Sequence, residues 1–495
     1  MKQFEFHATA SRVAQAKLAH SFTPNLMSLL QFVWVAAVVT GLVITMLGVR
    51  GGLVLLGVGL MTGCYVTWLR HGLLDIARTP LADSVELADI LPAEIVDGYR
   101  PNLTGQQLFL LAANTWDGRF ILERYEFSAN DCLPAVQDWQ LIHQDLWLAT
   151  AEIAEKTQLA FMTNAMIIAA CFSINPALKD LLTQRKLTLD DLCAGINWAA
   201  RLGVYTKAKR PSYGGIARDW AAGFTPLLSQ FGTSLSQQVE FAGKFFQLEE
   251  RTSQLDTLVT ELNGANGSVV LVGEPGIGKT ALLLGLADRI LQGVESGRLA
   301  HHQIFTLNAS SIIAEAGTVG SVEQIVMALC NEAIHARNIV LALDEAQLFF
   351  GQGTGAVNLS QVLLPYLQSR SLTLVLAVTP GDWQRLKATN AGLTSLLTPL
   401  ILSEPDQATT LATLADRSLL METPANVTIT YSALVAAYRL AERYIQEEAY
   451  PGRALKILEA SLNHAQNGFV TAAAVEAAVE AQFGVKVGAT TAAES

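Results

Sequence analysis

The residues best suited to chemistry stand together in one glycine-rich segment between positions 273 and 280. Glycines at this spacing let backbone N–H groups turn inward around phosphate oxygens, and a lysine that follows them reaches the β and γ phosphates. A hydroxyl directly after the lysine is a ligand for Mg²⁺. The segment is predicted to be a P-loop that binds ATP, and its members are Gly273, Glu274, Pro275, Gly276, Ile277, Gly278, Lys279 and Thr280.

Some of these residues, and three others further along, are predicted to serve catalysis. Lys279 is expected to stabilise the transferred phosphate, and Thr280 is expected to hold Mg²⁺ together with Asp344. Glu345 is predicted to orient and polarise the attacking water, because phosphoryl transfer mostly requires positioning and charge compensation. Thr379 is predicted to sense the γ phosphate, and the alternative is a threonine that caps a turn.

Buried strands must place these residues at one edge of a sheet. The apolar run 268–272 leads into the P-loop and the pattern at 281–291 predicts a helix after it, which is the context that a P-loop requires. The runs 339–343 and 372–378 predict two more buried strands. Helical stretches alternate with them at 321–337 and 359–370. This order predicts a parallel α/β sheet with helices on both faces and a ligand at the carboxyl ends of the strands.

Two apolar runs near the beginning of the chain predict a two-helix transmembrane hairpin. Residues 27–47 and 53–69 carry no charge, and about 20 such residues cross a hydrocarbon core of about 30 Å. Lysines and arginines flank the pair, whereas only Arg50 stands in the connecting turn. The positive-inside rule therefore predicts a multi-pass protein of the cell (inner) membrane, with both termini and everything after Arg70 in the cytoplasm. A cleaved signal peptide and a buried hairpin of a soluble core are the alternatives.

The charge balance argues against one class of partner. The 495 residues carry a net charge of −11 and no stripe of lysine and arginine, so we expect no binding of nucleic acid, which requires clustered cations. The five cysteines are scattered without CxxC or metal-ligand spacing, and their number is odd. We expect a reducing compartment and no structural metal.

Three stretches together resemble the first AAA+ module of Clp-family unfoldases and disaggregases. They read VVLVGEPGIGKTALLLGLADRI, IVLALDEAQLFFGQGTGAVNLSQVLLPYLQSRSLTLVLAVTPGDWQRLK and AERYIQEEAYPGRALKILEASL. The similarity covers about residues 225 to 488. It implies ATP hydrolysis that remodels or unfolds proteins, a homo- or hetero-hexameric ring with a Clp-type ATPase, and a small helical domain. It also implies that Arg453, in YPGRAL, contacts the nucleotide at the sensor-two position, and a surface salt bridge is the alternative for this residue.

A helical repeat precedes this module. The stretches 103–127 and 163–192 recur at a regular spacing, and they resemble the doubled repeat of Clp amino-terminal domains. That resemblance implies recruitment of protein substrates or adaptors, and an unrelated helical domain is the alternative.

The predicted fold class is an α/β P-loop AAA+ module with an α-helical small domain, an α-helical Clp-N-like domain and the transmembrane hairpin. The predicted domains are a cytosolic segment 1–25, the hairpin 26–70, the Clp-N-like repeat 80–203, a linker 204–240, the large P-loop domain 241–404, the small helical domain 405–485 and a disordered tail 486–495.

Two departures from the Clp pattern bear on mechanism. Where Clp modules carry paired arginines that reach the neighbouring subunit's ATP, residues 390–397 contain no arginine. An arginine finger accelerates phosphoryl transfer by about 10³ to 10⁵, so a ring of this chain alone should hydrolyse ATP slowly. The pore loop of the family presents an aromatic residue, whereas residues 316–320 contain none. Two hypotheses therefore stay open, an active remodelling ATPase and an ATP-binding scaffold or regulatory subunit.

Overall fold

The computed structural model describes residues 4–7, 10–21, 24–48, 51–74, 79–96, 98–207, 225–242, 251–264, 266–295, 297–316, 318–351 and 358–484. The chain divides into two units, Met1–Arg201 and Leu202–Ser495, each of which is described by itself. Residues 208–224 of the predicted linker and the whole predicted tail lie outside the described residues, and the domain boundaries stay predictions.

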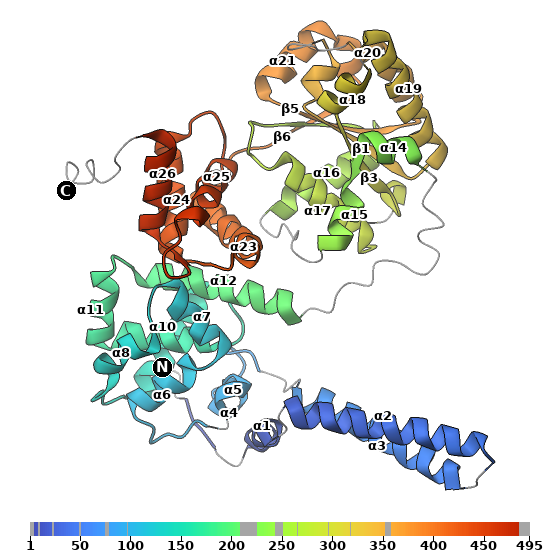
Figure 1. Cartoon of the computed structure of the whole chain (residues 1–495). Helices are drawn as coiled ribbons and strands as arrows, with labels where there is room; N and C mark the ends of the chain where they lie inside the picture. Colours follow the sequence, from blue (N-terminus) through green and yellow to red (C-terminus); the bar gives the residue numbers. More distant parts are fainter. Residues whose placement is uncertain are drawn as a thin grey trace. The chain divides into compact units, whose positions relative to one another are not determined.

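The first unit contains a pair of apolar helices, α2 (Pro24–Met46) and α3 (Gly51–Leu74), which run along each other (Figure 1). Glycines let their backbones approach closely. A Cβ on Gly41 would lie 2.7 Å from the nitrogen of Leu56, and a Cβ on Gly59 would lie 2.9 Å from the side chain of Val38. Small residues at such positions are typical of helix pairs in membranes, where close van der Waals packing and not the hydrophobic effect drives association.

Within the described residues, one helix is long and apolar enough to cross a membrane, over the window Leu29–Met46. The apolar part of α3, Gly51–Tyr65, is shorter than that test requires. The transmembrane hairpin of α2 and α3 therefore stays a prediction.

The rest of the first unit is helical. Its helices are α1 (Ser11–Ser21), α4 (Leu87–Ile90), α5 (Ala93–Val96), α6 (Gly105–Ala113), α7 (Trp116–Arg124), α8 (Ala129–Val136), α9 (His143–Thr157), α10 (Asn164–Ile174), α11 (Pro176–Gln184) and α12 (Leu189–Lys207). The two repeated stretches fold alike. Thr104 caps α6 as Thr163 caps α10, and Ser128 caps α8 as Thr188 bonds to the first turn of α12. The apolar helix α10 is buried along most of its length and forms the core of this part.

A six-stranded sheet organises the second unit. Its strands are β1 (Gly232–Ser234), β2 (Val269–Val272), β3 (Gln303–Asn308), β4 (Ile339–Asp344), β5 (Thr373–Val378) and β6 (Thr398–Ile401), in the order β1-β3-β4-β5-β2-β6. Strands β2 to β6 are parallel. The prediction of a purely parallel sheet is wrong at one edge, because β1 runs antiparallel to β3. Strand β1 belongs to the segment that enters the domain and is not joined to β3 by the helical crossover that makes neighbouring strands parallel.

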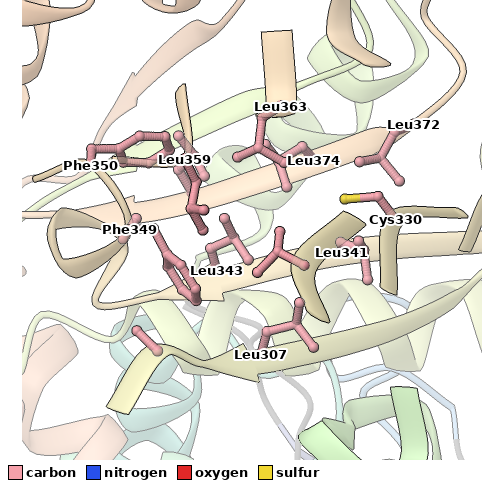
Figure 2. Packing of buried hydrophobic residues seen from close by; sticks show 14 of the residues in the cluster. Leu307, Cys330, Leu341, Leu343, Phe349, Phe350, Leu359, Leu363, Leu372 and Leu374 are labelled. Atoms are coloured by element: carbon pink, nitrogen blue, oxygen red, sulfur yellow. The ribbon is translucent and has the colours of Figure 1, made fainter. Parts of the chain in front are cut away.

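Both faces of the sheet are covered by helices, as the continuous burial of β2, β4 and β5 requires. Leu341 and Leu343 of β4 face one cluster with Leu307, Phe349 and Leu374 (Figure 2). Residues between them in the strands face a second cluster. The covering helices are α14 (Pro226–Phe231), α15 (Leu235–Ala242), α16 (Thr252–Asn263), α17 (Lys279–Leu291), α18 (Ala309–Ala316), α19 (Val319–Ala336), α20 (Ser360–Gln368), α21 (Pro380–Thr389) and α22 (Ala391–Thr394) (Figure 1).

Helices α23 (Gln407–Ala425), α24 (Tyr431–Tyr444), α25 (Gly452–Ser461) and α26 (Ala472–Phe483) form the small domain. A short parallel pair, β7 (Thr428–Ile429) and β8 (Phe469–Val470), joins their loops. The segment between α24 and α25 returns to the large domain, where it contributes to the site described next.

Candidate nucleotide-binding site

The glycine-rich loop connects the end of β2 to the start of α17, as predicted. Gly276 and Gly278 have φ angles of +78° and +97°, values that residues other than glycine rarely adopt. The N–H of Gly273 donates to the carbonyl of Val378 at 3.1 Å, so the end of β5 borders the loop. Because α17 begins at Lys279, the free N–H groups of its first turn and its dipole face the same space, which favours phosphate.

Lys279 lies across this loop. Its Nζ donates to the carbonyl oxygens of Gly273 at 2.7 Å and Glu274 at 3.0 Å. Burial lowers the pKa of the ammonium, and the nearby carboxylates of Asp344, Glu274 and Asp382 oppose that shift. The predicted phosphate-binding cation is thus held at the loop by two backbone carbonyl oxygens.

The end of β4 supplies the acidic side of the site. The hydroxyl of Thr280 lies 3.5 Å from Oδ2 of Asp344. The N–H of Glu345 donates to Oδ1 of Asp344 at 3.1 Å, and Glu345 is exposed with a φ of +49°. A left-handed backbone at a glutamate is uncommon and is concentrated at functional sites. The hydroxyl and carboxylate oxygens are the donor set that Mg²⁺ takes from proteins when phosphates and water complete its shell.

Thr379 stands at the end of β5 and at the start of α21. Its hydroxyl donates to Oδ2 of Asp382 at 2.7 Å and accepts from the N–H of Asp382 at 3.2 Å. The hydroxyl therefore caps α21, which is the alternative interpretation of this residue. Its role as a sensor of the γ phosphate stays a prediction, and sequence analysis missed Asp382 because an acidic third residue is common in helices.

Arg453 approaches the site from the small domain. Its Nη2 donates to Oε1 of Glu404 at 2.8 Å, and the guanidinium stacks on the ring of Tyr450 at 3.7 Å. The same segment touches the loop directly, since the N–H of Gly452 donates to the carbonyl of Gly276 at 3.0 Å. The arginine thus makes the salt bridge that was the alternative interpretation, and it does so beside the phosphate loop.

The structure also describes the two segments that depart from the Clp pattern, around residues 316–320 and 390–397. Helix α18 ends at Ala316 and α19 begins at Val319, so only two residues connect them, and Thr318 caps α19. Within the arginine-free stretch, Leu397 is buried and Leu396 packs partly against the core on one face of the sheet. The leucines of this stretch serve packing, whereas Ala391 and Ser395 are exposed.

A glycine-rich loop between a parallel strand and a helix, faced by an Asp-Glu pair at another strand end, defines the class of P-loop nucleoside triphosphatases. Residues 269–389 match the family described as the ATPase family associated with various cellular activities (AAA).

Curated proteins similar to this chain include Clp proteins. The ClpA homolog of Cyanidium caldarium is 29% identical over 237 residues, which cover 47% of this chain and 28% of the relative. ClpB of Meiothermus ruber is 30% identical over 292 residues, covering 57% of this chain and 34% of the relative. The solved structure of the S. cerevisiae Hsp104-ADP complex matches with a TM-score of 0.48 and 25% identity over 52% of this chain and 46% of that chain.

The P-loop module thus matches the AAA family and is similar to Clp proteins, as the resemblance implied. The chain spans about a third of the length of the curated relatives it matches.

Proposed function

We propose that this protein is a membrane-anchored AAA+ ATPase that binds ATP with Mg²⁺ and hydrolyses it to remodel or unfold other proteins. One observation carries the proposal. The structure brings Lys279, Thr280, Asp344 and Glu345 together at the carboxyl edge of one sheet.

Each of these residues has a distinct task in the proposed reaction. Backbone N–H groups of the loop and Nζ of Lys279 bind the phosphates, and Lys279 exchanges its carbonyl acceptors for phosphate oxygens. Thr280 and Asp344 hold Mg²⁺, which supplies charge compensation when bound. Glu345 orients the attacking water and accepts its proton.

The membrane anchor is part of the proposal and rests on the surface of the helix pair. Large apolar side chains of α2, such as Phe32 (75% exposed) and Met46 (80% exposed), point away from the protein interior. The hydroxyls of Thr40 and Thr45 donate to carbonyls of their own helix, both at 2.7 Å, so neither needs water. A lipid environment would satisfy both features. We propose the cell (inner) membrane as location, with both termini and the ATPase module in the cytoplasm.

Ring assembly and partner recognition complete the proposal. The relatives named above motivate a homo- or hetero-hexamer with a Clp-type ATPase, and the helical repeat of the first unit would recruit protein substrates or adaptors. Nucleic acid is not among the proposed partners, because the chain lacks a basic stripe.

A second candidate function is supported by the two departures. A two-residue connection between α18 and α19 leaves little chain for a gripping loop, and the leucines of the arginine-free stretch pack against the core. Both favour an ATP-binding regulatory or scaffold subunit that hydrolyses ATP slowly without a partner's arginine.

Steady-state phosphate release by the full chain in lipid nanodiscs separates the two. The remodelling ATPase predicts turnover that Glu345→Gln lowers about a hundredfold or more, since the water loses its base. A rate equal to that of Glu345→Gln would reject turnover by this chain alone. The regulatory subunit predicts that outcome, together with ATP-dependent thermal stabilisation that Lys279→Ala abolishes.

A further inference from the structure

Asp382 is the third residue of α21, and Thr379 is the residue immediately before this helix. Its carboxylate accepts a hydrogen bond from the Thr379 hydroxyl at 2.7 Å. Its backbone N–H donates to the oxygen of the same hydroxyl at 3.2 Å. Thr379 can donate to a phosphate or to a water only after it leaves this carboxylate, because a hydroxyl has a single proton to donate.

The position of Asp382 relative to the phosphate loop follows from the sheet. Strands β2 and β5 are paired in register, with Val272 opposite Val378. The residue after each strand therefore lies at the same edge, and Gly273 there bonds both to Val378 and, through its carbonyl, to Nζ of Lys279. Asp382 is thus hydrogen-bonded to Thr379, the residue that follows β5. The end of β5 in turn borders the loop that contacts Lys279.

The charge of Asp382 is only loosely compensated by its own helix. Nη1 of Arg385 lies 3.6 Å from Oδ1 of Asp382, and the Arg385 side chain is 69% exposed. A solvated ion pair at this distance neutralises a carboxylate weakly. The opposite oxygen of the carboxylate points to Thr379, toward the strand end.

We propose that Asp382 is a positioning residue that sets the preference between ATP and ADP. It places a negative charge beside the end of the site where the γ phosphate must lie, and it withholds the Thr379 hydroxyl from that phosphate. ATP carries the additional phosphate and ADP does not, so the carboxylate penalises ATP more. This inference rests on the proposed function, since it assumes that Lys279 marks the phosphate end of a nucleotide site.

The alternative role for Asp382 is helix capping alone. Asp382→Asn separates the two, because asparagine keeps the backbone N–H that the Thr379 hydroxyl accepts and offers a neutral oxygen to the Thr379 proton. The cap survives and the charge is lost. Asp382→Glu is the conservative partner, since it keeps the charge.

The test uses the full chain in nanodiscs with Glu345→Gln as the parent, so that ATP persists. Dissociation constants for Mg-ATP and Mg-ADP are measured by displacement of a fluorescent ADP. Asp382→Asn in this parent is expected to tighten ATP about three- to tenfold, the size of one charge interaction near a surface, and to leave ADP within about twofold. Asp382→Glu should keep the parent's ratio.

Asp256→Asn is the matched control. It removes the same charge from α16, where Asp256 pairs with Arg289 at the far end of α17, and the ratio should not change. The melting temperature without nucleotide reports whether each variant folds.

Two results would overturn the inference. An unchanged or weakened preference for ATP in a folded Asp382→Asn protein that binds both nucleotides would reduce Asp382 to a cap, with the proposed function intact. Failure of the parent to bind either nucleotide would reject the inference together with the site assignment.

Discussion

The backbone N–H of Gly452 donates to the carbonyl oxygen of Gly276 across 3.0 Å, which joins the small domain to the phosphate loop without a side chain between them. A neighbouring bond, from the N–H of Ala449 to the carbonyl of Pro275 at 2.8 Å, doubles the contact. Both acceptors belong to the loop that would enclose phosphates. These two bonds attach the segment that carries Arg453 directly to the loop.

Gly452→Ala should disrupt this contact. A Cβ on Gly452 would lie 2.5 Å from the Cα of Gly276, closer than real Cβ atoms come, so loop and segment must separate. We expect ATP-dependent thermal stabilisation to fall to less than half of the wild-type value. Gly203→Ala, where a Cβ meets nothing within 4 Å, is the control. Equal stabilisation of both variants would show that the contact is dispensable.

Arg453→Gln and Glu404→Gln should have different effects on nucleotide. If Arg453 contacts the phosphates, Arg453→Gln weakens Mg-ATP binding by about tenfold, the contribution of one charge-assisted hydrogen bond. Glu404→Gln removes the competing negative charge and leaves an amide oxygen that can still accept from the N–H of Tyr450, so ATP affinity should hold or rise. Isothermal titration of the two variants gives the answer. If both weaken ATP equally, the 2.8 Å pair acts as a unit and Arg453 has no separate role at the nucleotide.

Asp117→Ala should loosen the helical repeat of the first unit. The Asp117 carboxylate accepts from the backbone N–H groups of Asn164 and Ala165, at 2.8 and 3.3 Å, and so ties α7 to the start of the buried helix α10. Leaving buried donors unpaired costs about 1–3 kcal/mol. Amide hydrogen exchange across α10 should accelerate correspondingly, whereas Asp138→Ala, at an exposed position, should not change it. Unaltered exchange in Asp117→Ala would contradict the assigned role.

The contribution of His143 to the stability of the first unit should fall on mild acidification. Burial lowers the pKa of His143, although its hydrogen bond to the Leu103 carbonyl opposes the shift. Below about 6.5 the unfolded chain binds a proton that the folded unit resists, so this contribution is complete above that pH and is lost toward the lower folded pKa. The unfolding midpoint of His143→Gln should drop less between pH 7.5 and 5.5 than that of wild type or of the exposed His335→Gln. A parallel decline in the three proteins would exclude His143 as the cause.

The parts of the site that sequence analysis located are those that depend on local pattern. The P-loop must follow a buried strand and precede a helix, and β2 and α17 hold it so. An apolar run that ends in two acids was sufficient to locate Asp344 and Glu345 at a strand end.

The parts that it missed depend on contacts between distant segments. The structure pairs Asp382 with Thr379, Glu404 with Arg453, and Gly452 with Gly276. No spacing in the sequence predicts these contacts. The short edge strands were missed for a related reason. The segment TPLI of β6 contains a proline and pairs with one neighbouring strand, β2. Neither its periodicity nor its residue propensities predict a strand.

Cysteine reactivity should report whether α3 is embedded in lipid. Four of the five cysteines are buried, and burial raises the pKa of Cys330 and of Cys132 to about 12, so these two thiols stay protonated and unreactive. Cys64, on α3, is exposed on the protein. If a bilayer covers α3, a charged maleimide should fail to modify Cys64 in sealed vesicles or nanodiscs, because the thiolate forms only in water.

The matched positive control is Gln137→Cys, at an exposed position after α8, which should be modified within minutes under the same conditions. Mass spectrometry of the intact chain then counts the adducts, and denaturation in detergent should make all five native cysteines available. Rapid modification of Cys64 in the folded, reconstituted protein would show that α3 faces water. In that case the pair α2 and α3 could not be a transmembrane hairpin, and the apolar surface of α2 would require a protein partner.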